Sequence, residues 1–150
     1  MVYSKYEMIM RKNEIRDSRY EYNVTGSCDA YDFCRDVLHL QEYPEEHFIV
    51  IGVNARGDVV GFFEVSKGNL ESTAASPREV FRPVIGGMPA ASILCAHNHP
   101  SGSELPSNED IRTTERLMDA GKILGIPVLD HLIIGDEKFT SLRAAGYMND

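Results

Sequence analysis

Two histidines separated by one residue, with a serine and an aspartate shortly downstream, constrain this chain more than any other part of its sequence. His97 and His99 flank Asn98, and Ser107 and Asp110 follow a segment rich in proline, serine and glycine. In a strand, residues i and i+2 point to the same side, so both imidazoles can reach one ion while Asn98 faces away. The turn residues end that strand and let Asp110 return to the same point. The pattern therefore predicts a strand, a turn and a zinc site with one coordination position left for water.

Ser107 and Asp110 also fit a structural role at the start of a helix. A Ser-x-x-Asp sequence is a capping pattern, because the serine oxygen accepts the backbone N–H of the aspartate and the acidic side chain reaches back to the first turn. Taken alone, the pair indicates a cap, and His-x-His is common by chance. The two interpretations of Asp110 are compatible, since a ligand in the first turn of a helix is held rigidly. The combination of all these residues favours a metal site.

The same residues resemble the JAMM motif of the JAB/MPN+ metalloprotease-like domains. In that motif a distant glutamate precedes a His-x-His-Pro element, which a Ser-x-x-Asp element follows. The spacing from His97 through Pro100 to Asp110 fits the motif without a gap. The resemblance covers about residue 27 to the C-terminus, and four segments are similar to the RadC branch of the family: 76–81, 97–102, 108–111 and 124–131.

The resemblance implies roles for individual residues. The zinc ligands would be His97, His99 and Asp110. Ser107 would donate a hydrogen bond to the oxyanion that forms when water adds to a carbonyl, and Glu46 would be the general base. In the family this glutamate begins the strand after the first helix, which is the position of Glu46, but the adjacent Glu45 leaves the register open by one residue. The alternative interpretation of Glu46 is a solvated residue ahead of a buried strand.

The first part of the chain predicts an arm and a helix. Residues 1–26 are charged and rich in tyrosine; residues 6–10 fit a strand, and the arm could pack on the domain or on a second copy. Ser27 has the position of an N-cap, and apolar residues then recur with helical spacing from Ala30 to Leu38, which predicts one buried helix face.

The middle of the chain predicts a hairpin followed by a second helix. Residues 48–53 and 59–65 are β-branched and aromatic runs separated by a turn, and a short strand is expected at 70–73. Ser76 and Glu79 fit a capping box for a helix that begins at Pro77, and we expect that helix to kink or end early at Pro83. Its expected inward residues are Val80, Phe81, Val84 and Ile85.

The last part of the chain carries the motif. Residues 91–96 predict a strand that delivers the two histidines at its C-terminal end, so that the site lies at an edge of the sheet. Residues 108–124 predict a helix that ends at Gly125. The expected inner face of that helix is Ile111, Thr114, Leu117, Met118, Gly121 and Leu124. Strands follow at 128–134 and 138–141, where His131 is either a hydrogen-bonded structural residue or a support for a ligand. The elements predict one α/β domain over residues 27–150, a mixed sheet flanked by helices, and the resemblance implies the cytidine-deaminase-like JAB/MPN type.

Composition limits the partners of this domain. The chain has 150 residues and a net charge of −8, whereas a sequence-independent DNA binder needs clustered Lys and Arg to neutralise phosphates, so strong direct DNA binding is not expected. It is also too short for the helical DNA-binding module that precedes this domain in full-length RadC proteins. No apolar run predicts a membrane span or signal peptide, and Cys28, Cys34 and Cys95 lack metal-knuckle spacing, which favours a reducing, cytoplasmic location. Cys95 shares a strand face with His97 but is expected in the core.

These features predict a zinc-dependent hydrolase that attacks an amide or isopeptide bond in an unknown protein or peptide substrate. A second hypothesis is a DNA repair, recombination or mobile-element accessory protein of the RadC family that acts through protein or nucleic-acid contacts. A third is a metal-free scaffold that keeps the fold. The sequence leaves a homodimer open.

Overall fold

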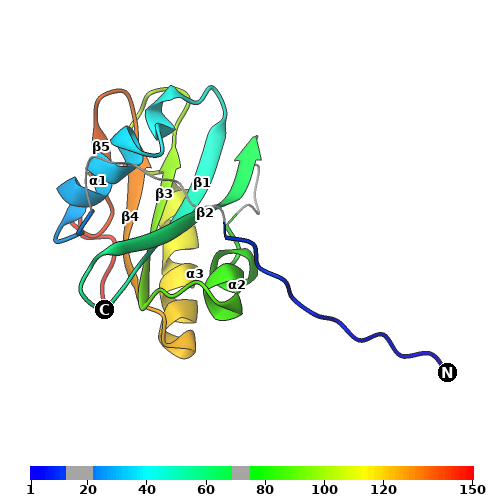
Figure 1. Ribbon diagram of the computed structural model, residues 1–150. Coiled ribbons are helices and arrows are strands. Elements are labelled where there is room, and N and C mark those ends of the chain that lie inside the picture. The colour runs from blue at the N-terminus through cyan, green and yellow to red at the C-terminus, as the bar shows by residue number, and fades with distance from the viewer. Residues whose placement is uncertain (13–21, 69–74) are drawn as a thin grey trace.

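A five-stranded mixed sheet forms the centre of the computed structural model, which describes residues 1–12, 22–68 and 75–150 (Figure 1). The strands are β1 (Glu46–Val53), β2 (Val59–Gly68), β3 (Ser92–Asn98), β4 (Val128–Ile134) and β5 (Phe139–Ser141). Their order across the sheet is β2-β1-β3-β4-β5. Strands β3 and β4 run parallel, whereas the other neighbouring pairs of described strands are antiparallel. The predicted α/β class with a mixed sheet is therefore confirmed.

Helices cover both faces of this sheet. Helix α1 (Ser27–Asp36) lies on one face, and α2 (Pro77–Gly86) and α3 (Asn108–Leu124) lie on the other (Figure 1). A short 3-10 helix, η1 (Leu40–Glu42), connects α1 to β1. Side chains alternate between the two faces along each strand, so every central strand contributes to both layers of the core.

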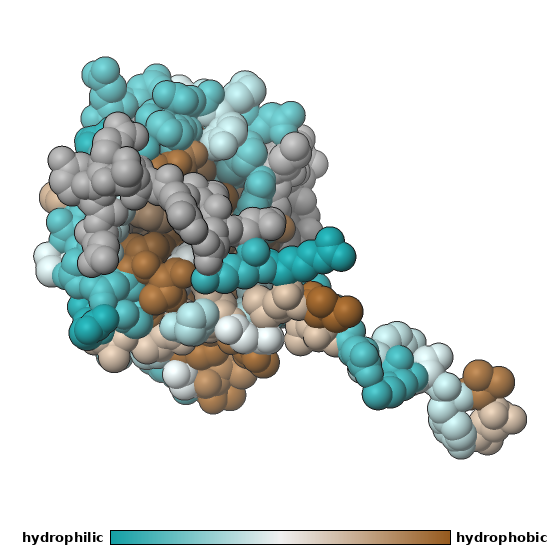
Figure 2. Space-filling model, in the orientation of Figure 1, coloured by the Kyte–Doolittle hydropathy of each residue, from teal (hydrophilic) through white to brown (hydrophobic). Residues whose placement is uncertain are grey.

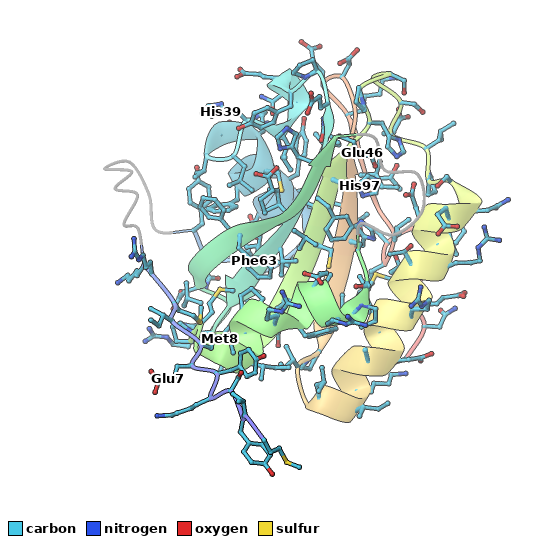
Figure 3. All side chains as sticks on the ribbon, turned by 90° about the vertical axis from the view of Figure 1, so that its right-hand side faces the viewer. Glu7, Met8, His39, Glu46, Phe63 and His97 are labelled. Carbon is cyan, nitrogen blue, oxygen red and sulfur yellow. The ribbon has the colours of Figure 1, made fainter. Side chains whose placement is uncertain are left out.

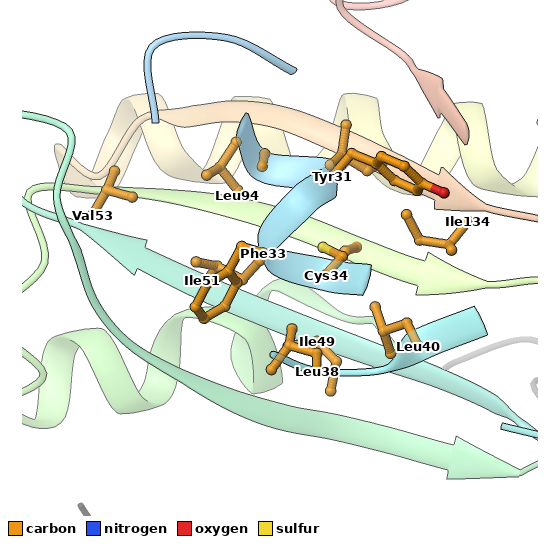
Figure 4. Packing of buried hydrophobic residues seen from close by; sticks show 13 residues of the cluster. Tyr31, Phe33, Cys34, Leu38, Leu40, Ile49, Ile51, Val53, Leu94 and Ile134 are labelled. Carbon is orange, nitrogen blue, oxygen red and sulfur yellow. The ribbon is translucent and has the colours of Figure 1, made fainter. Parts of the chain in front are cut away.

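The two faces of the sheet carry two separate hydrophobic clusters. The cluster under α1 includes Phe33, Ile51 and Leu94 (Figure 4). The cluster under α2 and α3 includes Phe81 and Leu117 of these helices, which pack on strand residues such as Val50 and Ile133. Ile51, Phe81 and Leu117 are each at most 1% exposed. Burial of large apolar side chains on both faces supplies the main driving force for this fold and holds the strands in one register.

Three details of the helices differ from the sequence prediction. Helix α2 continues past Pro83 to Gly86, so the early end expected at Pro83 is wrong; the Pro83 carbonyl accepts the backbone N–H of Met88 and closes the last turn. The side chain of Ser76 makes no capping hydrogen bond, so the expected capping box is absent there. Ile85 and Leu124 are 60% and 44% exposed. Both were expected on the inward face, but they lie at the ends of their helices. Helical periodicity alone does not show how far along a helix the contact with the sheet extends.

The N-terminal prediction is also corrected in part. Residues 1–12 are exposed and form no strand, so the strand expected at 6–10 is wrong. The first residues of the arm project from the domain (Figure 2), whereas the side chains of Met8 and Met10 lie beside Gly86 at the end of α2, so this part of the arm packs on the domain. Helix α1 begins one residue earlier than expected, with Gly26 as N-cap in place of Ser27. The strand expected at 70–73 lies outside the described residues. Among the residues that are described, no helix is long and apolar enough to cross a membrane.

Candidate metal centre

Strand pairing brings the glutamate and the first histidine of the motif to one face of the sheet. Phe48 of β1 lies opposite His97 of β3, and their rings stack with centroids 5.9 Å apart. Glu46 precedes Phe48 by two residues and therefore projects to the same face, where it lies beside His97 (Figure 3). The centre lies at the carboxyl end of β3, the middle strand of the sheet, which is the end of the strand at which the two histidines were expected.

Four side chains of the motif converge at this point. The Nε2 atoms of His97 and His99 are 3.1 Å apart. The Asp110 carboxylate lies 3.2 Å from His97 Nε2 and 3.3 Å from His99 Nε2. Glu46 Oε1 lies 3.7 Å from His97 Nε2. His97 is 1% exposed, whereas the other three side chains are partly exposed, so the group is open to solvent on one side.

Helix α3 holds Asp110 in place through its first turn. Ser107 Oγ accepts the Asp110 backbone N–H at 3.0 Å, and the Asp110 carboxylate accepts the Ser107 backbone N–H at 2.8 Å. This is a reciprocal capping box. One carboxylate thus caps the helix and faces both imidazoles, as the compatible interpretations of Asp110 anticipated. The hydroxyl proton of Ser107 is not used by the cap, because the oxygen takes part as an acceptor.

A chain of buried hydrogen bonds fixes the orientation and the tautomer of His97. The Thr114 hydroxyl donates to the carbonyl oxygen of Asp110 at 2.7 Å, so its oxygen accepts from His131 Nδ1 at 2.6 Å. Burial lowers the pKa of His131 well below its usual value, which keeps this ring neutral with Nε2 as an acceptor. His97 Nδ1 therefore donates to His131 Nε2 at 2.8 Å. Nε2 of His97 is left with its lone pair on the side of Asp110 and His99.

A separate hydrogen bond fixes the second ring in the same sense. His99 Nδ1 lies 3.0 Å from the carbonyl oxygen of Ser103, which can only accept, so Nδ1 carries the proton and Nε2 the lone pair. The protonated form of the ring also carries a proton on Nε2, from which the Asp110 carboxylate accepts a hydrogen bond, and this contact raises the pKa of His99. Two imidazole lone pairs and a carboxylate in such close contact repel one another unless a cation or protons lie among them.

The spacing of these donor atoms fits a divalent ion. Atoms bound about 2.0–2.1 Å from a tetrahedral zinc ion are about 3.3 Å from one another. The three separations among His97, His99 and Asp110 are 3.1, 3.2 and 3.3 Å. Glu46, His97 and His99 also offer donor atoms within 4.8 Å of one another. Because Glu46 lies further from His97 than Asp110 does, the distances favour Asp110 as the third ligand and leave Glu46 beside the site.

The two acidic groups differ in their protonation. The two imidazoles hold the pKa of Asp110 well below its usual value despite its burial, so it is a carboxylate at neutral pH. Burial raises the pKa of Glu46 and so moves this pKa toward neutral pH, which suits a general base. The thiol of Cys95 lies two residues before His97; burial raises its pKa to about 12, so it stays protonated in the core.

Three residues of the centre were not assigned a role from the sequence. Thr114 was expected only on the inner face of its helix, and Asn98 was expected only to face away from the ion. Ser103 contributes its backbone, for which no side-chain pattern exists. The alternatives left open for His131 are both met, because it is fully buried in a hydrogen-bond chain and also supports His97. Polar residues on predicted apolar faces were the signal that could have identified Thr114 and His131.

Comparison with known proteins identifies the family. The RadC-like JAB domain family matches residues 24–147. A UPF0758 protein of Bacillus cereus (strain 03BB102) is 42% identical over 131 residues, which cover 87% of this chain and 56% of the relative. A UPF0758 protein of Geobacillus sp. (strain WCH70) is 49% identical over 104 residues, which cover 69% of this chain and 46% of the relative. The chain thus spans about half the length of these curated relatives, whose names assign no activity. The resemblance read from the motif is confirmed, and this chain belongs to the RadC-like JAB domain family.

Proposed function

We propose that this chain is a zinc-dependent hydrolase of the JAMM type that cleaves an amide or isopeptide bond in a protein or peptide. The observation that carries the proposal is the set of separations among His97 Nε2, His99 Nε2 and the Asp110 carboxylate, 3.1, 3.2 and 3.3 Å, which lie close to the about 3.3 Å expected around a tetrahedral ion. Both rings are fixed with their Nε2 lone pairs toward one another, an arrangement that a cation stabilises.

His97, His99 and Asp110 would hold the ion. When bound, zinc supplies a Lewis acid that polarises a carbonyl and makes water a nucleophile at neutral pH. Glu46 takes the proton of the attacking water and passes it to the leaving amine, a role that requires a carboxylate close to the ligands but outside their set. Its distance of 3.7 Å from His97 Nε2 and its raised pKa support this assignment.

Ser107 would stabilise the charge that develops on the carbonyl oxygen. Its oxygen accepts from the Asp110 backbone N–H, so the hydroxyl proton can be donated to an oxyanion at the open side of the site. The net charge of −8 favours a protein or peptide over a nucleic acid as the substrate, because phosphates would be repelled.

Two measurements test the proposal. Mass spectrometry of protein purified without added metal should find about one zinc per chain, lost in His97→Ala. A library of linear peptides and lysine-linked isopeptides should then yield products with the wild type and none with Glu46→Gln, while Glu45→Gln, the exposed neighbour, remains active. A folded wild type that neither contains nor takes up zinc would refute the proposal. Loss of zinc from Glu46→Gln would refute the assignment of Glu46 as the base, because it would show that Glu46 helps to hold the metal.

A further inference from the structure

Asn98, the residue between the two histidines, makes a set of contacts that the metal centre does not require. Its side chain is 2% exposed and lies on the opposite face of the sheet from His97. Oδ1 accepts the backbone N–H of His47 at 2.7 Å. Nδ2 donates to the carbonyl oxygens of Glu45 at 2.9 Å and Tyr43 at 3.3 Å. The partners fix the orientation of the amide, because a backbone N–H only donates and a carbonyl only accepts.

These contacts hold the two peptide groups on either side of Glu46. The carbonyl of Glu45 belongs to the peptide bond before Glu46, and the N–H of His47 belongs to the peptide bond after it. Backbone pairing between β1 and β3 ends at Phe48 and His97, so no β3 backbone pair is formed at this position. The Asn98 side chain takes the place of the missing backbone partner and continues the attachment of β1 to β3 past the end of the ladder.

A second contact secures the same segment from the neighbouring strand. The His47 ring stacks on Tyr43 with centroids 4.0 Å apart, and His47 Nδ1 lies 2.7 Å from Glu64 Oε1 of β2. The residue after Glu46 is thus held by its backbone through Asn98 and by its side chain through Glu64. The backbone of Glu46 has little freedom to rotate, while its carboxylate projects to the face of the metal centre.

From this geometry we propose that Asn98 is a positioning residue, which holds Glu46 at the distance from the ligands that proton transfer requires. The inference rests on the proposed function, in which Glu46 is the base. A general base acts only within hydrogen-bond reach, and a misplacement of about 1 Å can cost about 100-fold in rate. Asn98 touches neither the ligand atoms nor the open side of the site, so its effect must pass through the backbone of Glu46.

The test compares Asn98→Ala with Asn54→Ala. Asn54 is a matched control because its side chain also bonds to the backbone: it accepts the N–H groups of Arg56 and Asp58, just beyond the opposite end of β1. Asn98→Ala should keep about one zinc per chain, speed amide hydrogen exchange at His47 roughly tenfold or more, and displace the Glu46 carboxylate by about 1 Å in a crystal structure. Asn54→Ala should leave His47 exchange and Glu46 unchanged.

Turnover of a library-derived substrate supplies the decisive comparison. Asn98→Ala should reduce kcat about 100-fold, whereas Asn54→Ala should leave kcat unchanged. Asn98→Ser, whose shorter hydroxyl side chain keeps a polar group but cannot span all three backbone partners, serves if Asn98→Ala does not fold, and should show the same pattern. An unmoved Glu46, loss of zinc, or an equal loss of kcat in Asn98→Ala and Asn54→Ala would overturn the inference. If the wild type has no turnover, the proposed function fails, and the exchange and crystallographic results still decide whether Asn98 positions Glu46.

Discussion

Replacement of Thr114 by valine tests the buried hydrogen-bond chain behind His97. Thr114 is 1% exposed, and its hydroxyl links the Asp110 carbonyl to His131 Nδ1. Valine has nearly the same volume, so the substitution leaves no cavity but removes the acceptor for a buried imidazole N–H. An unsatisfied buried donor costs about 1–3 kcal/mol. For a chain of this size that loss lowers the thermal midpoint by roughly 2–12 °C.

The same substitution should weaken zinc binding. Without its partner, His131 can adopt the other tautomer, and His97 then loses the acceptor that directs its Nε2 lone pair toward the ligand position. Loss of such a supporting contact typically costs about 10–100-fold in metal affinity. Thermal unfolding of metal-free protein, followed by circular dichroism, separates the stability effect from the affinity effect, which a chelator competition measures.

Thr113→Val is the control, because Thr113 precedes Thr114 on α3 and undergoes the same chemical change at a half-buried position. We expect this variant to retain both the midpoint and the zinc affinity of the wild type within error. If Thr114→Val binds zinc as tightly as Thr113→Val does, the hydrogen-bond chain does not set the tautomer of His97, and the argument for paired lone pairs at the site fails.

Three further predictions concern the centre and its loop. Asp110 raises the pKa of His99 in the metal-free protein, and zinc must displace the proton of the His99 imidazolium in order to bind. Zinc affinity should therefore fall about tenfold per pH unit below the His99 pKa, and a pH-independent affinity would contradict this. Nitrogen-15 NMR of the metal-free protein at alkaline pH should show His97 and His131 both protonated on Nδ1; the Nε2–H form of either ring would contradict the hydrogen-bond chain. Gly102 has a φ of +84° and a Cβ there would meet the Asp136 carboxylate, so Gly102→Ala should destabilise the protein by about 1–3 kcal/mol in chemical denaturation, and an unchanged midpoint would show that the loop relaxes freely.

Local sequence patterns were sufficient for most of the fold. The β-branched runs of β1 and β2 and the helical spacing in α3 depend on neighbours in the chain, and each predicted a described element. The early end expected at Pro83 was wrong, since α2 tolerates the missing N–H and the Pro83 carbonyl still closes the last turn. The exposed arm was misjudged because residues 6–10 suit a strand but have no partner strand among the described residues.

A local sequence pattern could predict the residues of the site only where they lie close together in the chain. His97, His99 and Asp110 share one segment, and the structure brings them together. The choice between Glu45 and Glu46 depends on the register of β1 against β3, which local pattern does not give; the structure brings Glu46 to His97. The contacts of Thr114 and Asn98 join segments far apart in the chain, so they follow from the fold and not from any motif.

The alternation within His97-Asn98-His99 has a consequence for folding. A slip of β3 by one residue against β1 would exchange its two faces, sending both imidazoles toward the α1 cluster and the amide toward the centre. The misplaced rings would be buried away from Asp110, and the segment around Glu46 would lose the partner for its backbone groups. A misaligned chain therefore loses two sets of contacts that depend on this tripeptide. The residues of the site thus also favour the correct alignment of the central strands during folding.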